Sequence, residues 1–163
     1  MKSALSLGSN LGDRKKILTD ACGKLADLPQ TRVVAVSSFY ETEPIDSPPN
    51  SPMFLNAVVL IDTALAPLEL LRETQAIENA FGRVRSVPNA PRTLDIDILF
   101  YGDLILDTPE LTLPHPRAYL RRFVLEPLAE LLPDFILPNQ TQTVSQLLKK
   151  IPVETSLLNI ENL

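Results

Sequence analysis

Two aspartates within an otherwise apolar segment are the first candidates for chemistry in this chain. Residues 94–101 predict a β-strand, and because side chains alternate between the faces of a strand, Asp95 and Asp97 should share one face. At a separation of about 7 Å, two carboxylates repel by roughly 2 kcal/mol at an effective dielectric of about 20. Oxygen ligands at this spacing suit Mg²⁺, which also takes ligands from water and phosphates. The opposite face should carry Leu94, Ile96, Ile98 and Phe100.

The arginines bear on an alternative interpretation, in which the aspartates are a solvent-facing pair balanced by ordinary ion pairs. No lysine lies between Lys24 and Lys149, yet this span holds eight of the nine arginines, and six of these fall between Arg83 and Arg122. A guanidinium binds phosphate in bidentate fashion, whereas an ammonium acts as a hydrated point charge. The local excess of arginine therefore favours a phosphate-bearing ligand.

Composition narrows the class of protein. A chain of 163 residues is the length of one ordinary domain, and its net charge of −5 argues against a general nucleic-acid binder. Cys22 is the only cysteine, which excludes an internal disulfide and is typical of a reducing compartment. The longest apolar run, 57–61, is far shorter than a membrane span of about 20 residues. We therefore expect a cytoplasmic protein with no membrane or nucleic-acid partner.

The hydrophobic pattern predicts six elements in the first two thirds of the chain. Strands are predicted at 3–7, 32–40, 56–63 and 94–101. One helix follows the first strand and ends near residue 27, and a second helix follows the third strand, over 67–82. Their order is that of a ferredoxin-like β-α-β-β-α-β unit. Further segments are a short strand at 105–106 and helices at 118–131 and 142–151. We predict a single α+β domain over 1–163, with a ferredoxin-like βαββαβ core and additional C-terminal helices packed as an α/β sandwich.

Other polar residues leave their roles open on local grounds. The loop 8–12 lacks the signatures of Walker A and dinucleotide-binding loops, so a tight turn is the better interpretation. Gln75 and Glu78 share a helix face that is either solvated or ligand-binding. His115, the only histidine, lies between two prolines, where a structural role is more common than a catalytic one. Asn56 either recognises the polar edge of a heterocycle or caps a turn.

Longer motifs carry a resemblance to a known family. They read L-G-S-N-L-G at 7–12, S-S-F-Y-E-T-E-P at 37–44, F-L-N-A-V at 54–58, T-Q-x-I-E at 74–78, G-R-V-R at 82–85, P-R-T-L-D-I-D-I at 91–98, L-T-L-P-H-P-R at 111–117 and R-x-F-V-L-x-P-L at 121–128. In these segments, which span nearly the whole chain, the sequence resembles the 6-hydroxymethyl-7,8-dihydropterin pyrophosphokinases of folate biosynthesis. The resemblance implies a Mg²⁺-dependent enzyme that transfers pyrophosphate from ATP to the pterin alcohol, giving AMP and the pterin diphosphate.

The resemblance also implies roles for individual residues. Two Mg²⁺ ions would be held by Asp95 and Asp97 and would bridge the ATP phosphates. The nucleotide would be bound by Gln75, Glu78, Arg83, Arg85, Arg92, Ile98, Thr112, His115 and Arg121. The pterin would be bound by Thr42, Pro44, Ile45, Phe54, Asn56 and Phe123. Catalysis is assigned to Arg83, Arg92 and Asp97.

The mechanism implied is in-line attack of the hydroxymethyl oxygen on the β-phosphorus, with catalysis by positioning and charge neutralisation. Asp97 could accept the hydroxyl proton, or Mg²⁺ could acidify the hydroxyl without a dedicated base. Two other functions stay open: a non-catalytic nucleotide-binding regulatory module of the same fold, and a pyrophosphokinase for a different alcohol. We expect a monomer, since no heptad pattern or long apolar patch is visible in the sequence.

Overall fold

A central antiparallel sheet organises the computed structural model, which describes residues 1–42, 53–82, 93–152 and 158–159. The strand order is β5-β1-β4-β3-β8. β2 also pairs with β4: β3 pairs with residues 54–56 of β4, and β2 pairs with residues 59–63. The strands are β1 (Lys2–Ser9), β2 (Thr31–Val36), β3 (Tyr40–Thr42), β4 (Phe54–Thr63), β5 (Asp95–Tyr101) and β8 (Leu158–Asn159). Every pairing in this sheet is antiparallel.

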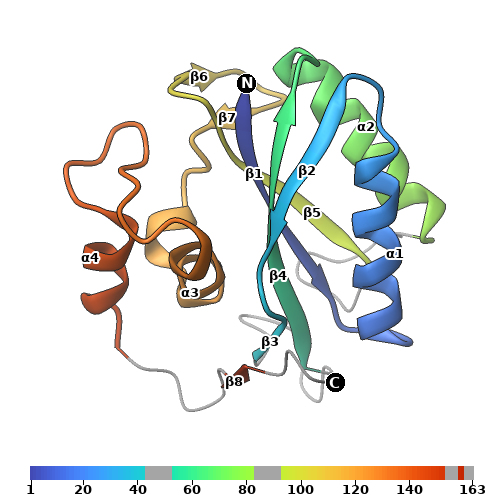
Figure 1. The fold of residues 1–163 in the computed structure, drawn as a ribbon, viewed down its shortest axis with the longest axis horizontal. Coiled ribbons are helices and arrows are strands. Elements are labelled where there is room, and N and C mark those ends of the chain that lie inside the picture. Colours follow the sequence, from blue (N-terminus) through green and yellow to red (C-terminus); the bar gives the residue numbers. More distant parts are fainter. Residues whose placement is uncertain (43–52, 83–92, 153–157, 160–163) are drawn as a thin grey trace.

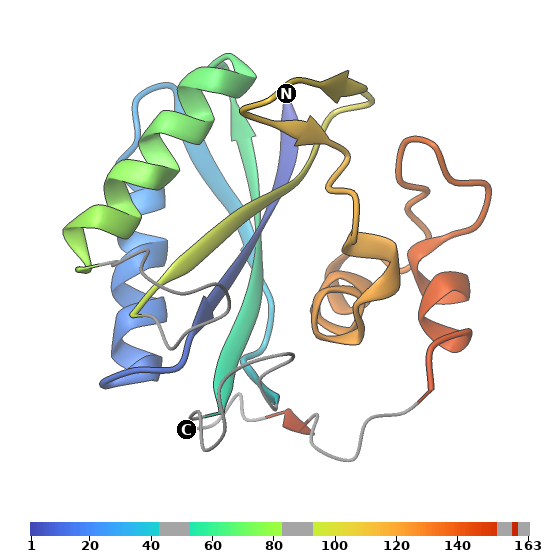
Figure 2. The ribbon, with the colours of Figure 1, turned by 180° about the vertical axis from the view of Figure 1, so that it is seen from behind.

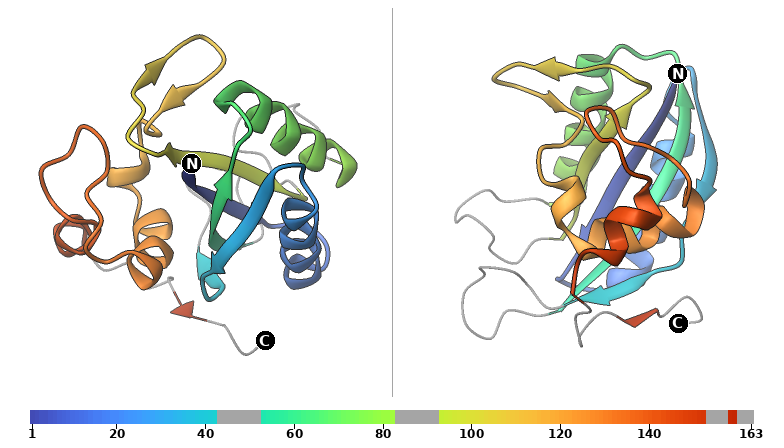
Figure 3. Two further views of the ribbon diagram at one scale, coloured as in Figure 1. Left: turned by 45° about the horizontal axis from the view of Figure 1, so that its top comes forward. Right: turned by 90° about the vertical axis from the view of Figure 1, so that its left-hand side faces the viewer.

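Helices lie on both sides of the sheet (Figures 1 and 2). On one side are α1 (Arg14–Ala26) and α2 (Pro67–Ala80). On the other are the 3-10 turn η1 (Ala118–Leu120) and the helices α3 (Arg122–Leu131) and α4 (Val144–Lys149), as Figure 3 shows from two further directions. A small hairpin of β6 (Leu106–Asp107) and β7 (Thr112–Leu113) leads from β5 towards η1. No helix in the described part of the chain is long and apolar enough to span a membrane.

Chain connectivity confirms the predicted α+β fold. β1, α1 and β2 form one split unit with β4 between its strands, and β4, α2 and β5 form a second with β1 between its strands. This arrangement is the ferredoxin-like βαββαβ core, in which each helix crosses the same face of the sheet. Local signals begin these helices: the Asp13 side chain accepts a hydrogen bond from the Lys16 N–H, and Pro67 occupies the first turn of α2.

Two hydrophobic cores flank the sheet. Between the sheet and α1 and α2, side chains such as Leu7, Leu18 and Leu70 are fully buried. Between the sheet and α3 and α4, a second cluster contains Phe100, Leu125 and other residues, and the Phe100 and Phe135 rings stack with centroids 4.5 Å apart. The additional C-terminal helices thus pack on the sheet as predicted.

Three sequence-based predictions need correction. Phe100 belongs to the second core and not to the face of Ile96 and Ile98, because a bulge between the Leu5–Ile98 and Ala4–Phe100 pairs places both Leu99 and Phe100 in that core. The predicted helix 118–131 is two elements, since Arg121 has extended backbone angles of −111° and 116°. The predicted strand 32–40 is divided into β2 and β3, for a reason given below. In addition, β7 and β8 were not predicted.

Candidate active site

The two aspartates on β5 and Asn56 on β4 lie on either side of β1, on the same face of the sheet. In the strand register Gly8 of β1 pairs with Asp95 on one side and with Asn56 on the other. Two residues further along β5, Asp97 pairs with Ser6. Because directly paired residues direct their side chains to the same face, the two carboxylates and the amide flank the narrow strip of β1 between them.

This face is the one that α3 and α4 cover in part. Val58 and Leu99, which have the same strand parity as Asn56 and Asp97, are buried in the second core. Asp95 and Asp97 themselves are only half-buried. We call the end of this face that α3 and α4 do not cover, defined by Asp95, Asp97, Gly8 and Asn56, the open face.

Gly8 contributes no side chain of its own between the carboxylates and the amide, which leaves room for the neighbouring side chains of Asn56 and Phe54. A Cβ atom on Gly8 would lie 3.0 Å from the Asn56 Oδ1 and 3.5 Å from a ring carbon of Phe54. A glycine inside a strand often marks such a close approach. Gly8 is a site residue that the sequence analysis did not assign: it placed Gly8 in a turn at 8–12, whereas in the structure β1 continues through Gly8 to Ser9.

The amide of Asn56 has a defined orientation. Its Nδ2 donates a hydrogen bond of 2.7 Å to the Thr42 hydroxyl on β3, and its Oδ1 is the atom nearest to the Gly8 position. Both side chains are buried, with 3% of Asn56 and 8% of Thr42 exposed. The amide therefore places its acceptor beside Gly8, within the open face, and directs its donor to β3.

Glu78 has a contact that sequence reasoning missed. Its side chain is only 3% exposed and accepts a hydrogen bond of 2.8 Å from the Ile96 N–H on β5. Since β5 is the first strand of the sheet and pairs with β1 on its other side, Glu78 fastens α2 to the outer edge of the strand that carries both aspartates. Gln75, one turn earlier, is exposed.

His115 lies beside the same strand. Its backbone N–H donates to the Leu99 carbonyl at 2.8 Å, and its Nδ1 accepts from the Arg117 N–H at 3.1 Å. Burial lowers the pKa of His115 to about 4, assisted by the positive charges of Arg121 and Arg117 and opposed by Asp95. The imidazole is therefore neutral at pH 7, and these influences place it within electrostatic reach of both an arginine and a site aspartate.

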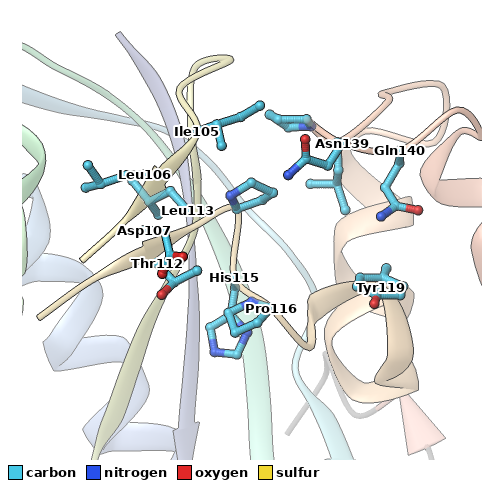
Figure 4. A pocket seen from close by; sticks show the side chains of 13 residues that line it. Ile105, Leu106, Asp107, Thr112, Leu113, His115, Pro116, Tyr119, Asn139 and Gln140 are labelled. Carbon is cyan, nitrogen blue, oxygen red and sulfur yellow. The ribbon is translucent and has the colours of Figure 1, made fainter. Parts of the chain in front are cut away.

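A cavity of about 410 Å³ adjoins this segment. Thr112 and His115 lie on one side of it, and Tyr119, Asn139 and Gln140 lie across from them (Figure 4). Near the start of α3, the Arg121 guanidinium carbon lies 5.5 Å from the centroid of the Phe123 ring, a cation–π contact. Thr112, His115 and Arg121 thus lie on the connection from β5 to α3, and Phe123 lies in the first turn of α3.

Five predicted site residues lie outside the described part of the chain: Arg83, Arg85, Arg92, Pro44 and Ile45. Among the described residues no group of three or more His, Cys, Asp and Glu side chains is arranged to hold a metal ion. Two carboxylates on one strand face still fit Mg²⁺, because this ion commonly binds one or two protein carboxylates and completes its shell with water and substrate phosphates.

Comparison with known proteins adds independent information. Residues 4–133 match the family model described as 7,8-dihydro-6-hydroxymethylpterin-pyrophosphokinase (HPPK). The chain is 45% identical over 150 residues to a 2-amino-4-hydroxy-6-hydroxymethyldihydropteridine pyrophosphokinase of Pseudomonas aeruginosa, covering 92% of this chain and 91% of the relative. It is 43% identical over 146 residues to the Haemophilus influenzae protein of the same name, covering 90% of each chain.

Solved structures share the fold. A wild-type Plasmodium falciparum HPPK-DHPS with SDX-DHP superimposes with a TM-score of 0.73 at 16% identity, covering 97% of this chain and 47% of the other. An HPPK-DHPS in complex with substrates gives a TM-score of 0.75 at 14% identity, covering 97% of this chain and 46% of the other. This chain therefore spans less than half the length of those proteins.

Proposed function

The chain belongs to the 7,8-dihydro-6-hydroxymethylpterin pyrophosphokinase family, and we propose that it brings its two substrates together on the open face. It is an enzyme that transfers pyrophosphate from ATP to 6-hydroxymethyl-7,8-dihydropterin in folate synthesis, as the motifs predicted. The observation that carries the proposed site is the register of Asp95, Gly8 and Asn56. This register would bring the phosphates and the heterocycle side by side, on either side of one glycine.

Asp95 and Asp97 are the proposed ligands of two Mg²⁺ ions. Bound Mg²⁺ would neutralise negative charge on the ATP phosphates. The chain supplies two half-buried carboxylates on one face of a strand whose outer edge is fastened to α2 through Glu78. A fixed strand holds both oxygen donors in a constant relation to the rest of the open face, which is what a positioning mechanism requires.

The nucleotide is proposed to lie along the outer edge of β5. Because the Ile96 N–H is directed outward to Glu78, the two-residue period of an antiparallel ladder directs the main-chain groups of Ile98 outward as well. Thr112, His115 and Arg121 follow on the connecting segment, where Arg121 would meet the phosphates. Gln75 and Glu78 on α2 complete the described part of this side. Arg83, Arg85 and Arg92 are assigned to it by resemblance alone.

The pterin is proposed to lie towards β3 and β4. The outward Oδ1 of Asn56 is an acceptor, and the amino-pyrimidinone edge of a pterin offers N–H donors, so the two are complementary. Phe54 and Phe123 are half-buried aromatic side chains of the kind that stack on a planar heterocycle. Thr42 belongs to the same side, and Pro44 and Ile45 are assigned to it by resemblance.

Catalysis would then consist mainly of orientation. The hydroxymethyl oxygen of the pterin attacks the β-phosphorus in line with the departing AMP, as in phosphoryl transfer generally. Arg83 and Arg92 are the proposed stabilisers of the charge that develops, and Asp97 is the proposed acceptor of the hydroxyl proton. His115, neutral at pH 7, supplies hydrogen bonding there and not positive charge.

The same proposal extends to the organisation of the protein. Residues 1–163 would form one domain, since both cores pack on one sheet. It would act as a monomer in the cytoplasm. A monomer is supported by the outer edge of β5, where the Ile96 N–H is already bonded to Glu78. A cytoplasmic location is supported by Cys22, the only cysteine of the chain.

The decisive experiment combines the purified protein with 6-hydroxymethyl-7,8-dihydropterin, ATP and Mg²⁺. We expect AMP and the pterin diphosphate, formed only when both the pterin and Mg²⁺ are present. ADP in place of AMP would show that a different group is transferred. Nucleotide binding without any turnover would favour the regulatory module.

A further inference from the structure

We propose that Glu130 of α3 is a positioning residue for pterin recognition, because it fixes the bulge that sets β3 against β4 and thereby orients the Asn56 amide. The inference rests on the proposed pterin side of the open face. It concerns a side chain that would not itself touch the substrate.

The argument begins where β2 and β3 leave their common partner. Val36 pairs with Val59 and Tyr40 pairs with Asn56, so residues 37–39 face only residues 57–58. The extra residue forms a bulge, and this is why the predicted strand 32–40 is divided. Ser37 compensates with its side chain, since the Val58 N–H donates to the Ser37 Oγ at 2.9 Å. A bulge re-aims the strand that follows it, so its geometry determines where β3 lies.

Glu130 of α3, a helix that packs on one face of the sheet, hydrogen-bonds to this bulge. Its carboxylate accepts from the Ser38 N–H at 2.9 and 3.1 Å and from the Ser38 hydroxyl at 3.1 Å. It also accepts from the Tyr40 hydroxyl at 2.7 Å. Ser38 lies in the bulge and Tyr40 is the first residue of β3, so one side chain on α3 holds both the bulge and the strand after it.

Two residues beyond Tyr40, β3 provides the hydroxyl that orients the site amide. Tyr40 and Thr42 have the same strand parity, and Tyr40 pairs directly with Asn56. The Thr42 Oγ1 accepts from the Asn56 Nδ2 at 2.7 Å. A displacement of β3 would therefore move the partner that turns the Asn56 acceptor towards the open face. Glu130 acts on recognition through this chain of contacts.

The test compares Glu130→Ala with Glu69→Ala. Glu69 is a matched control, because it is also an exposed glutamate that accepts a backbone N–H, from Ala66 at 2.9 Å, but at the start of α2 and not beside β3. Calorimetry would give the Kd of each variant for the unreduced pterin alcohol and for a non-hydrolysable ATP analogue with Mg²⁺. We expect Glu130→Ala to weaken pterin binding about tenfold, the size expected for the loss of about one hydrogen bond, with ATP-analogue binding within about twofold of the parent. Glu69→Ala should lower the melting temperature and leave both Kd values unchanged.

The inference would be overturned if Glu130→Ala weakened the binding of both ligands equally, or if its Kd for the pterin equalled that of Glu69→Ala. Tyr40→Phe removes one hydroxyl and keeps the buried ring, so it provides a second test if Glu130→Ala does not fold, and it should weaken pterin binding selectively by a smaller factor. Asn56→Ala separates the two proposals. If it leaves pterin binding unchanged, the proposed pterin side is wrong; if it weakens binding while Glu130→Ala and Tyr40→Phe do not, only the positioning role fails.

Discussion

The two faces of the central sheet differ in how completely they are covered. On the face of α1 and α2, the side chains of Leu5, Leu7, Ala57 and Val59 are fully buried along the whole length of the strands. On the other face, α3 and α4 cover the end that carries Ala4 and Phe100. The opposite end of that face carries Asp95, Asp97 and Asn56 around Gly8.

The difference shows how one set of strands can serve both stability and chemistry. Strand alternation sends apolar side chains to the fully covered face and leaves every second position available for another purpose. The charged groups of such a site contribute little to packing. The strands that carry them are held by the hydrophobic core on the other face of the sheet. The two faces should therefore respond differently to substitution.

The largest effect should follow Asp97→Ala on the open face. We expect kcat to fall about a thousandfold at saturating Mg²⁺, a loss typical of removing one group that stabilises transition-state charge. The melting temperature should change much less than kcat, because a half-buried side chain contributes little to the packed core. Steady-state kinetics and thermal denaturation measure both effects, with Asp103→Ala, an exposed carboxylate just beyond β5, as the control. Ordinary turnover would remove Asp97 from the mechanism.

The opposite response is expected on the covered face. Leu70→Ala deletes a fully buried side chain of α2 and should lower the free energy of unfolding by about 3 kcal/mol. Below the melting temperature, kcat should change little. Urea denaturation measures the loss, and Leu120→Ala, at a residue 61% exposed, should stay within about 0.5 kcal/mol of the parent. A large fall in kcat of folded Leu70→Ala would show that the two faces are coupled.

A smaller effect is expected at the boundary between the carboxylates and the amide. In Gly8→Ala the new Cβ would lie 3.0 Å from the Asn56 Oδ1, so the amide must shift by a few tenths of an ångström. We expect the pterin Kd to rise about tenfold, while Gly23→Ala on α1, where nothing lies within 4 Å, leaves it unchanged. Calorimetric titration distinguishes the two variants, and equal Kd values would mean that the Asn56 acceptor is not used.

The smallest expected effect concerns pH. The pKa of His115 is about 4 in the folded protein, chiefly through burial, against 6.5 for an unperturbed histidine. As the pH falls from about 6.5 to 4, the unfolded chain binds a proton that the folded chain does not, so stability decreases through this range. Between pH 7 and pH 5 the free energy of unfolding of the parent protein should fall by about 1 kcal/mol more than that of His115→Gln, after allowance for partial solvent screening. Parallel stability profiles for the two proteins would contradict the assignment.

The sequence was sufficient for features that depend on local pattern. Periodicity and turn residues predicted the βαββαβ order, and strand alternation correctly placed Asp95 and Asp97 on one face. It failed where a single residue changes the register, as at Leu99, between Val33 and Ala35, and in the bulge at 37–39. No local pattern predicts these bulges, because each depends on which strand lies alongside.

Contacts between distant residues were likewise beyond the sequence. Glu130 and Ser38 are separated by 92 positions, and Glu78 was expected to line a ligand cleft without any indication that it accepts the Ile96 N–H. Predicted roles for Arg83, Arg85, Arg92, Pro44 and Ile45 came from resemblance, and these residues lie outside the described structure. They remain predictions.

The hydrogen bond between Glu78 and β5 also affects how molecules of this protein meet in solution. The outer strand of a sheet can act as a template on which a second copy adds its own strand, the first step towards aggregation. Here a carboxylate takes up the Ile96 N–H that an incoming strand would need, and the Leu99 carbonyl accepts from the His115 N–H. The outer edge of β5, the strand that carries the two aspartates, is therefore unfavourable for pairing with a strand of a second molecule.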